Sequence, residues 1–576
     1  MYARNSPRSA YWILYSIIPP FCIIIMRLCY LQIHLNPLLH AQSKKNYLRI
    51  EHIKPQRGNI LDIHGALLAT NQPITHIQWY GTGCYTLTNN QRSILEAIAK
   101  ITGIQILNNQ SLLHDIQRAE RFGKTCMIAK EVSFDQLSKI KEQFPLHENI
   151  SLCIDFKRHY PYQQYACHLL GYLGSLDMQL VGKMGLEKLL HDSLEGEYGQ
   201  ILKTINSTGK SLAHKELKKA LCGNNIQTTI DIQLQTIAEQ SFPADYAGTM
   251  IIMNPHNGDM LTLLSRPHFD PSLFLKPIST TEWEQLQEQR PFINRAFNAH
   301  YPPGSIFKLI TTAASLEENI LTEDSIWDRK GYVRCGNRKF WCNRKSGHNH
   351  ISTLESLAQS CNYMFYQLGK KIDIDTIAHY AHLFGLGEKT HIIFHEKEGF
   401  IPTRTWKHTM KGERWWPGET LSVMIGQSYI LTTPIQIARM IGSIFTGYLV
   451  TPRLLTQEPI NITPLAIKES TRTFLQKSMK KVVSKGTGKR LKQLKNIRIY
   501  AKTSTAQTSS LEKRSLGEQF LEHGWFVGQF TYKNENPLIM VILVENAGTA
   551  RVATNIAKEF LVKYKRHIDV TSKNTQ

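Results

Sequence analysis

The most informative segment of this 576-residue sequence is Tyr301-Pro302-Pro303-Gly304-Ser305-Ile306-Phe307-Lys308. Its prolines and glycine interrupt any preceding element, and apolar residues then recur at helical spacing, at Ile306, Leu309, Ile310 and Ala313. This pattern predicts a helix over 306–316 with Ser305 at its start and Lys308 one turn further along, on the same side. A serine hydroxyl needs a base to become a nucleophile, and a lysine amine becomes that base when desolvation or a neighbouring cation lowers its pKa. The segment therefore predicts a nucleophile and its base, with helix-start N–H groups available to an oxyanion.

The spacing S-x-x-K is weak evidence by itself, because it occurs five times in the chain. Two later groups strengthen the prediction. Ser360-Cys361-Asn362 lies in a helical pattern over 354–369, and Lys502-Thr503-Ser504-Thr505 continues the alternating strand pattern that begins at Ile497. We expect Ser360 to relay a proton to a leaving amine and Asn362 to orient the acyl chain. A second cation at Lys502 is expected to hold Lys308 neutral by repulsion and to bind a substrate carboxylate.

In this order, the motifs S-x-x-K, S-x-N and K-T-x-T resemble those of the penicillin-binding proteins and serine β-lactamases. The resemblance continues outside the expected site, as far as about residue 565. Arg57-Gly58-Asn59-Ile60-Leu61-Asp62, Arg158-His159-Tyr160-Pro161 and Gly185-Leu186-Glu187 resemble landmarks of the non-catalytic module of class B penicillin-binding proteins. Gly426-Gln427 and His523-Gly524-Trp525-Phe526 resemble the elongation-specific, penicillin-binding protein 2 type of that family.

The resemblance implies a peptidoglycan D,D-transpeptidase that acts in cell-wall elongation and maintenance of cell shape. Ser305 would attack the penultimate D-Ala carbonyl of a stem peptide, D-Ala would leave, and an amine on a neighbouring stem would take the acyl group. β-Lactams would acylate the same serine. The N–H groups of Ser305 and Thr505 would form the oxyanion hole, and Lys502 and Thr503 would hold the terminal carboxylate. No cofactor is implied, and no residue is assigned to a metal site.

The predicted fold class is α+β, with a single N-terminal transmembrane helix, a mixed α/β pedestal module and a β-lactamase-like transpeptidase domain. Strand-like runs at 249–253, 260–264, 525–532 and 537–544 enclose long helical patterns, which favours an antiparallel sheet with helices on its faces. The expected boundaries are 1–35 for the cytoplasmic tip and anchor, 50–240 for the pedestal or dimerisation module and 247–565 for the transpeptidase domain, with a disordered tail at 566–576.

The anchor is predicted from the uncharged run Tyr11 to Met26, which resumes after Arg27. Arg4 and Arg8 favour a cytoplasmic N-terminus, so the body of the chain is expected outside the cytoplasmic (inner) membrane, on the periplasmic side. A cleaved signal peptide is the alternative.

The net charge of +22 is spread along the chain. We expect this basic surface to face acidic lipid or polymer, and we expect no nucleic acid as a partner.

The expected partners follow from what the chain lacks. The segment between the anchor and Arg57 is too short for a second catalytic domain, so the glycan strands must be polymerised elsewhere. The resemblance implies a membrane-embedded glycosyltransferase of the shape, elongation and division (SEDS) class, within an elongation complex.

Two departures from the family pattern matter. Ser504 replaces the glycine of K-T-G, and Ser428 replaces the second glycine of G-Q-G. Because glycine lets a ligand backbone approach a strand closely, we expect Ser504 to slow acylation by some β-lactams without abolishing turnover.

Four further residues are close in sequence: Cys335, Cys342, His348 and His350. They leave open a metal site or a disulfide, although their spacing is not a standard zinc motif.

Four other functions remain compatible with parts of the sequence: a β-lactam hydrolase, a β-lactam sensor, a D,D-carboxypeptidase and an inactive binding scaffold. A sensor coupled to a protease should carry H-E-x-x-H, which does not occur in the sequence. A hydrolase leaves the long module before the catalytic domain unexplained. A carboxypeptidase differs only in the acyl acceptor, which the residues do not identify. The stem-peptide chemistry, the acceptor amine and the oligomeric state also stay open.

Overall fold

The computed structural model describes residues 8–145, 147–176, 179–205, 211–327, 331–348, 350–508 and 516–574. The chain forms two compact units. The first contains Met1–Arg57, Asn71–Lys157 and Glu195–Gly223, and the second contains Gly58–Thr70, Arg158–Leu194 and Asn224–Gln576. Parts of the expected 50–240 module thus belong to the second unit, and the expected domain boundaries stay a prediction.

The first unit begins with a long apolar helix. Helix α1 (Arg8–Cys29) continues through Pro19 and Pro20 and leads through a π-helical turn (Tyr30–His34) to α2 (Asn36–Tyr47). Within the described part of the chain, Tyr15–His34 is the one helical stretch long and apolar enough to cross a membrane, and none of it is buried in the protein. An exposed apolar stretch of this length fits the predicted anchor.

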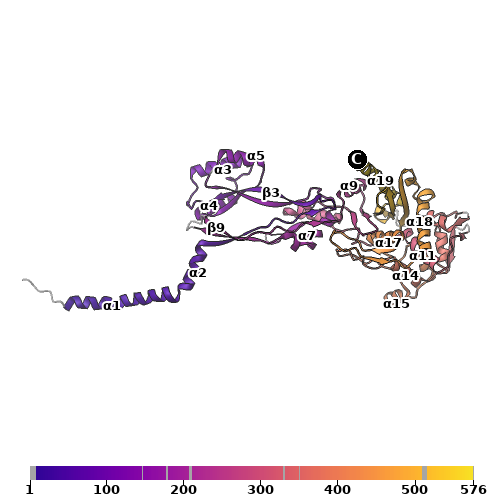
Figure 1. Ribbon diagram of the computed structural model, residues 1–576, viewed down its shortest axis with the longest axis horizontal. Coiled ribbons are helices and arrows are strands. Elements are labelled where there is room, and N and C mark those ends of the chain that lie inside the picture. The colour runs from indigo at the N-terminus through magenta and orange to yellow at the C-terminus, as the bar shows by residue number, and fades with distance from the viewer. Residues whose placement is uncertain are drawn as a thin grey trace, which may run out of the picture. The chain divides into compact units, whose positions relative to one another are not determined.

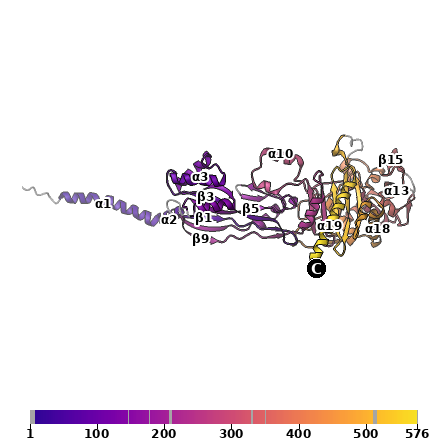
Figure 2. The ribbon, with the colours of Figure 1, turned by 90° about the horizontal axis from the view of Figure 1, so that it is seen from above.

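The rest of the first unit contains two groups of strands and three helices. One antiparallel sheet has the order β1 (Leu48–Ile53), β8 (Gly199–Ile205) and β9 (Ser211–Lys218). Strand β3 (Leu67–Tyr80) starts in the second unit, and in the first it pairs with β4 (Thr125–Val132) and β5 (Ile150–His159). The helices are α3 (Asn89–Thr102), α4 (Gln110–Phe122) and α5 (Phe134–Gln143). Helix α3 lies beside β3 (Figure 2). All three helices share an apolar core with β3, and this core includes the buried Trp79.

In the second unit, the three landmarks of the predicted non-catalytic module lie together. The fully buried guanidinium of Arg158 donates from Nε to Glu187 Oε1 at 2.7 Å and from Nη1 to the Gly58 carbonyl at 2.7 Å. Asp62 Oδ1 accepts the backbone N–H of Ala66 at 2.7 Å. Strand β2 (Ile60–Leu61) pairs in parallel with β10 (Ile226–Gln227). These motifs therefore hold separate chain segments together.

Replacing Glu187 with Gln is expected to lower the free energy of unfolding by about 3 kcal/mol, because it leaves the Arg158 guanidinium charged and buried. Denaturant unfolding of the detergent-solubilised full chain measures this. The matched control is Glu559→Gln, which removes the exposed i,i+4 ion pair with Lys563 at 2.9 Å. That change should cost at most about 0.5 kcal/mol. Equal losses for the two variants would contradict the prediction.

The centre of the second unit is an antiparallel sheet of five strands, in the order β12-β11-β21-β20-β19. The strands are β11 (Gly248–Met253), β12 (Met260–Arg266), β19 (Ile497–Ala506), β20 (His523–Tyr532) and β21 (Leu538–Val544). All four predicted strand runs are present. Side chains alternate between the two faces, so that Met250 and Ile252 join one apolar core and Ile251 and Met253 the other.

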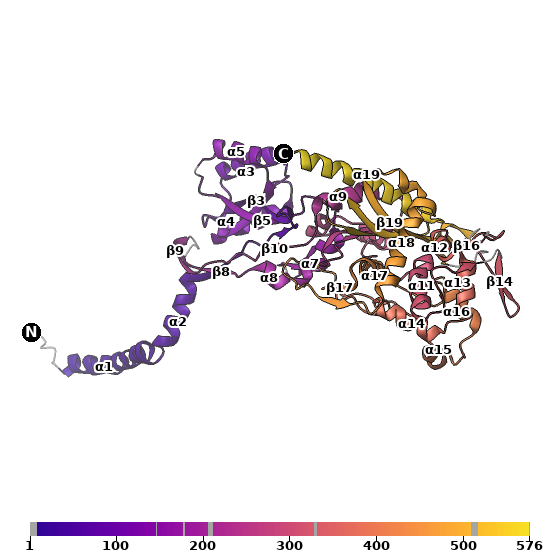
Figure 3. The same cartoon turned by 45° about the vertical axis from the view of Figure 1, so that its right-hand side comes forward.

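Helices cover both faces of this sheet. Helices α9 (Ile232–Ser241) and α19 (Ala550–Asn574) lie on one side, and α11 (Lys308–Glu317) and α17 (Pro434–Thr446) on the other (Figures 1 and 3). Helix α18 (Glu469–Lys485) contacts edge strand β19 and also α12 (Thr353–Ala358). This arrangement confirms the predicted α+β class with helices on an antiparallel sheet.

The remaining described elements of the second unit are short. The helices are α6 (Cys167–Leu170), α7 (Gly185–Leu189), α8 (His191–Glu195), α10 (Thr280–Gln289), α13 (Asn362–Leu368), α14 (Ile374–Leu383), α15 (Arg404–Lys411) and α16 (Pro417–Val423). The strands form pairs: β6 (Leu173–Leu176) with β7 (Gln179–Gly182), β13 (Ile326–Trp327) with β16 (Ile351–Ser352), β14 (Tyr332–Cys335) with β15 (Arg338–Trp341), and β17 (Tyr448–Val450) with β18 (Ile462–Pro464).

The predicted disordered tail is wrong for residues 566–574, because α19 continues to Asn574. Asp569 anchors its last turns, accepting hydrogen bonds from Tyr532 Oη at 2.7 Å and from Lys533 Nζ at 2.6 Å. The polar composition of this segment suggested a tail, but the apolar face of α19 earlier in the helix packs on the sheet. Residues 575–576 lie outside the described residues.

Candidate active site

Ser305 lies at a tightly packed turn that precedes α11. The turn is a short 3-10 helix (Gly304–Ile306) in which Gly304 has a φ of +52° and donates its N–H to the Gly426 carbonyl at 3.0 Å. A Cβ at Gly304 would lie only 2.4 Å from Ser504 Oγ, so this position requires glycine. Ser305 is half-buried and lines a cavity of about 950 Å³. The turn therefore holds the predicted nucleophile at the edge of a space large enough for a peptide.

Lys308, at the first position of α11, brings the first two motifs together. Its ammonium is fully buried and donates three hydrogen bonds: to Asn362 Oδ1 at 2.6 Å, to the Ser360 carbonyl at 2.9 Å and to Ser360 Oγ at 3.3 Å. These bonds use all three protons of a charged lysine. Among the described hydrogen bonds, none joins Ser305 Oγ to Lys308 Nζ.

The helix expected over 354–369 is wrong, because the chain breaks it between α12 and α13. Ser360 has a φ of +56°, in the left-handed region that a serine rarely adopts. The Cys361 N–H returns to the Ser356 carbonyl at 2.8 Å, which closes α12. This turn directs both the carbonyl and the hydroxyl of Ser360 at Lys308, so the strained conformation has a role in the site.

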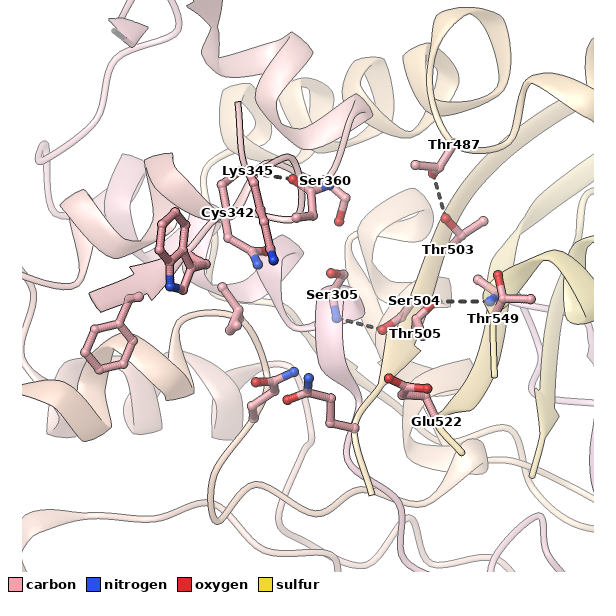
Figure 4. A pocket seen from close by; sticks show the side chains of 18 of the residues that line it. Ser305, Cys342, Lys345, Ser360, Thr487, Thr503, Ser504, Thr505, Glu522 and Thr549 are labelled. Atoms are coloured by element: carbon pink, nitrogen blue, oxygen red, sulfur yellow. Dashed lines mark hydrogen bonds between the residues drawn. The ribbon is translucent and has the colours of Figure 1, made fainter. Parts of the chain in front are cut away.

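Strand β19 supplies the third motif. Lys502 Nζ donates to Ser360 Oγ at 3.1 Å and to the Thr503 carbonyl at 3.0 Å, which places the Ser360 hydroxyl between two lysine amines. The Thr503 and Thr487 hydroxyls are 2.6 Å apart, and Thr505 Oγ1 accepts the Ala550 N–H at 3.1 Å (Figure 4). The structure therefore brings all eight predicted site residues into one region.

The pKa of Lys308 is lowered by a different cause from the one we expected. Burial lowers it to about 8, while the neighbouring thiols of Cys361 and Cys342 oppose this shift. Burial also lowers the pKa of Lys502 well below its ordinary value, and the charge of Lys308 lowers it further. We expected the charge of Lys502 to lower the pKa of Lys308. In the structure, the charge of Lys308 instead lowers the pKa of Lys502.

We expected Lys502 to bind a substrate carboxylate, but the structure does not place its amine at the cavity. Lys502 is fully buried, and it is not among the residues that line the cavity. Other cations do line it in the described part of the chain: Arg338, Lys339, Lys345, Lys489, Arg490 and Arg551. Glu522 is the one acidic residue among the described lining residues. The cavity is therefore strongly positive and suited to an anionic ligand.

Sequence reasoning missed these cations, because their elements are far apart along the chain. It also missed Thr487, although the Gly-Thr-Gly segment Gly486–Gly488 before β19 was a usable signal. The largest omission concerns Ser504. Its Oγ accepts the backbone N–H of Ser305 at 2.7 Å (Figure 4). This N–H is one of the two that are expected to bind the oxyanion.

A cysteine–histidine group lies at the cavity wall, to which Cys342 contributes. The ligand atoms of Cys342, His348 and Cys361 all lie within 4.8 Å of one another, so they could hold a metal ion. The two sulfur atoms are 3.7 Å apart, and both cysteines are free thiols. Their shared hydrogen bond lowers the pKa of Cys342 and raises that of Cys361. Of these three residues, the sequence analysis named Cys342 and His348 but not Cys361. Cys335 and His350 are not in this group of described residues.

Comparison with known proteins identifies this site. Residues 248–562 match the penicillin binding protein transpeptidase domain, and residues 52–228 match the penicillin-binding protein dimerisation domain. The chain is 27% identical to the peptidoglycan D,D-transpeptidase MrdA of Acinetobacter baumannii, over 93% of this chain and 84% of that protein. It is 25% identical to MrdA of Escherichia coli K12, over 96% and 92% of the two chains.

Solved structures agree. A chain in a structure titled "Structural coordination of polymerization and crosslinking by a peptidoglycan synthase complex" superposes with a TM-score of 0.76 at 27% identity, over 97% of this chain and 98% of that one. The penicillin-binding protein (PBP2) in its complex with MreC from Helicobacter pylori gives a TM-score of 0.75 at 26% identity, over 90% and 99%. The chain belongs to the penicillin-binding protein transpeptidase family. Within that family it is a class B protein of the elongation type, as predicted.

Proposed function

We propose that this chain is a serine acyltransferase that cross-links peptidoglycan stem peptides while the cell wall elongates, and that β-lactams acylate it at Ser305. The observation that carries the proposal is the buried amine of Lys308, which lies one helical turn after Ser305. This amine donates hydrogen bonds to Ser360 and Asn362. Desolvation lowers the pKa of Lys308 to about 8, so a useful fraction is a free base near neutral pH.

Acylation begins when Lys308 loses a proton. The neutral amine keeps two N–H donors for Asn362 and Ser360, and its lone pair becomes available to the Ser305 hydroxyl. Ser305 Oγ attacks the penultimate D-Ala carbonyl as its proton passes to Lys308. The N–H groups of Ser305 and Thr505 stabilise the oxyanion. The C–N bond then breaks as Ser360 gives its proton to the departing D-Ala amine and takes the proton held by Lys308, so that an ester on Ser305 and a neutral Lys308 remain.

Deacylation repeats these steps with a new amine. The acceptor amine attacks the ester carbonyl and passes one proton through Ser360 to Lys308. The C–O bond to Ser305 then breaks as Lys308 returns that proton to Ser305 Oγ, which leaves the amide cross-link and the free enzyme. Asn362 orients the acyl chain, and Thr503, Ser504 and Thr505 line the path of the donor peptide. The terminal carboxylate of the donor meets Thr503 and the positive cavity wall. The buried Lys502 acts through Ser360, to which its Nζ donates at 3.1 Å.

In this proposal residues 1–35 form the cytoplasmic tip and a single-pass anchor in the inner membrane. Residues 50–240 form the pedestal module and 247–565 the transpeptidase domain, both on the periplasmic side. The exposed apolar stretch Tyr15–His34 supports the anchor. Membrane attachment keeps the catalytic domain close to newly made glycan.

The proposed partners are a membrane-embedded glycosyltransferase of the SEDS class and the elongation complex around it. Support comes from the similar chain in a peptidoglycan synthase complex and from the similar penicillin-binding protein (PBP2) bound to MreC. The six cations that line the cavity support an anionic peptide as the ligand.

A pulse–chase experiment with fluorescent penicillin on the detergent-solubilised full chain tests the proposal. A transpeptidase should be labelled and should keep the label for many minutes during a chase with unlabelled penicillin. Loss within seconds would indicate a hydrolase, and absence of labelling an inactive scaffold. Incubation with a D-Ala-D-Ala peptide and an amine acceptor, followed by mass spectrometry, should then give the amide product; release of D-Ala by water alone would indicate a carboxypeptidase.

A further inference from the structure

The Ser504 hydroxyl accepts a hydrogen bond from one of the two N–H groups that a substrate oxyanion is expected to need. Ser504 Oγ lies 2.7 Å from the Ser305 nitrogen and accepts its N–H. Oxyanion-hole donors act at about 2.7–3.1 Å from the oxygen that they stabilise. A carbonyl oxygen and the Ser504 hydroxyl therefore compete for the same N–H group.

The packing around Ser504 favours this position of the hydroxyl. Ser504 is only 2% exposed, and its side chain alternates to the same face of β19 as Lys502. The turn that contains Ser305 contacts β19. A Cβ added to Gly304 would come within 2.4 Å of Ser504 Oγ, so the hydroxyl fills the space that the missing side chain leaves. The residue that departs from the family's glycine thus fits a site shaped for its hydroxyl.

We propose that Ser504 is a specificity-determining residue, whose hydroxyl caps the Ser305 N–H in the resting enzyme and must be displaced by each acyl donor. This inference rests on the proposed function of Ser305. A stem peptide makes contacts along the cavity that are remote from the reacting carbonyl, and these contacts offset the displacement. A small β-lactam makes fewer contacts. The cap therefore selects against small, rigid acyl donors and in favour of the extended peptide.

Three variants at position 504 separate the hydroxyl from the bulk of the side chain. Ser504→Ala removes the acceptor and keeps Cβ, Ser504→Gly removes both, and Ser504→Thr keeps the hydroxyl. We expect Ala and Gly each to raise the second-order rate constant for penicillin acylation about 3- to 10-fold, the effect of one freed hydrogen bond. Thr should not exceed the natural enzyme. The rate with a D-Ala-D-Ala peptide should rise less, so that the penicillin-to-peptide ratio increases.

A spectroscopic measurement tests the same point without relying on rates. In the penicillin acyl-enzyme, the ester carbonyl competes with Ser504 for the N–H. Its infrared stretching band should move to lower wavenumber in Ser504→Ala, because a freed N–H polarises the carbonyl more strongly. A change that only loosened the fold would broaden the band and lower the melting temperature instead.

The outcomes are distinguishable. If Ser504→Gly is faster but Ser504→Ala equals the natural enzyme, the Cβ is responsible and the proposed cap is wrong. Equal rates for all four proteins, with an unmoved carbonyl band, would also overturn it while leaving the proposed function intact. If none of the four is labelled at Ser305, the proposed function fails and the inference fails with it.

Discussion

Replacing Ser305 with Ala should abolish covalent labelling by fluorescent penicillin, a loss of at least about 1,000-fold in acylation rate. Ser305 supplies the only oxygen in the proposed scheme that becomes esterified, and no neighbouring group replaces it. The structure favours this outcome because the Ser360 hydroxyl, the nearest alternative in the scheme, is held between Lys308 and Lys502 at 3.3 and 3.1 Å.

The chain contains its own matched control for this experiment. Ser138 begins another S-x-x-K tetrapeptide, on helix α5, where it is exposed. Ser138→Ala should be labelled as strongly as the natural chain. Labelling that survived in Ser305→Ala, with a melting temperature equal to that of the natural chain, would mean that a different nucleophile is acylated. Peptide mapping of the labelled protein would then identify that residue.

Replacing Lys308 with Met should lower the acylation rate by about 100- to 10,000-fold, the usual contribution of a general base. Methionine fills a similar volume but cannot accept the proton of Ser305. Lys141→Met, in the exposed S-x-x-K of α5, is the matched control and should not change the rate. A comparable loss in both variants would contradict the assignment of Lys308 as the base.

The pH dependence gives a second measure of the same residue. Because burial lowers the pKa of Lys308 to about 8, its amine is mostly protonated below that pH and free above it. Acylation should therefore rise about tenfold per pH unit up to about pH 8 and then level off. Besides burial, the groups that influence the pKa of Lys308 are the thiols of Cys361 and Cys342, which oppose the lowering. The pKa of Lys502 is lowered further by the charge of Lys308, so Lys502 should not add a second rise above pH 8.

In Lys308→Met this rise should disappear. A natural-enzyme profile that stays flat between pH 6 and pH 9, or a rise that persists in the variant, would exclude Lys308 as the group whose ionisation controls acylation.

The pairing of Ser305 with Lys308 was predictable because the two residues are only three positions apart in the sequence. Residues three apart in a helix face the same side in any protein, and the Pro-Pro-Gly segment marks where that helix begins. The strands were equally predictable, since apolar and polar residues alternate from Ile497 to Lys502 and the other strands are short apolar runs that end at turns. The Ser360 motif was only half predictable. Its residues were named correctly, but the left-handed turn at Ser360 breaks a pattern that reads as one continuous helix.

Some roles depend on contacts between distant segments. The sequence shows a lysine at 502 but not that it is fully buried against Ser360, 142 positions away, and burial determines its charge. Cys361 reads as the middle of a motif, whereas folding brings it to Cys342 and His348. In the same way, the six cations of the cavity wall come from three distant parts of the chain, around residues 338–345, 489–490 and 551.

Local chemistry and spacing were sufficient to establish the protein's class, because the order of the three motifs, the apolar anchor and the strand-like runs can all be read directly from the sequence. The pKa and the hydrogen bonds of each group in the site depend on how much water is removed from it and on which protein groups replace that water. Tertiary packing alone determines both. Ser504 shows the difference, because the residue is evident in the sequence, but its hydrogen bond to the Ser305 N–H exists only where β19 packs against the turn before α11.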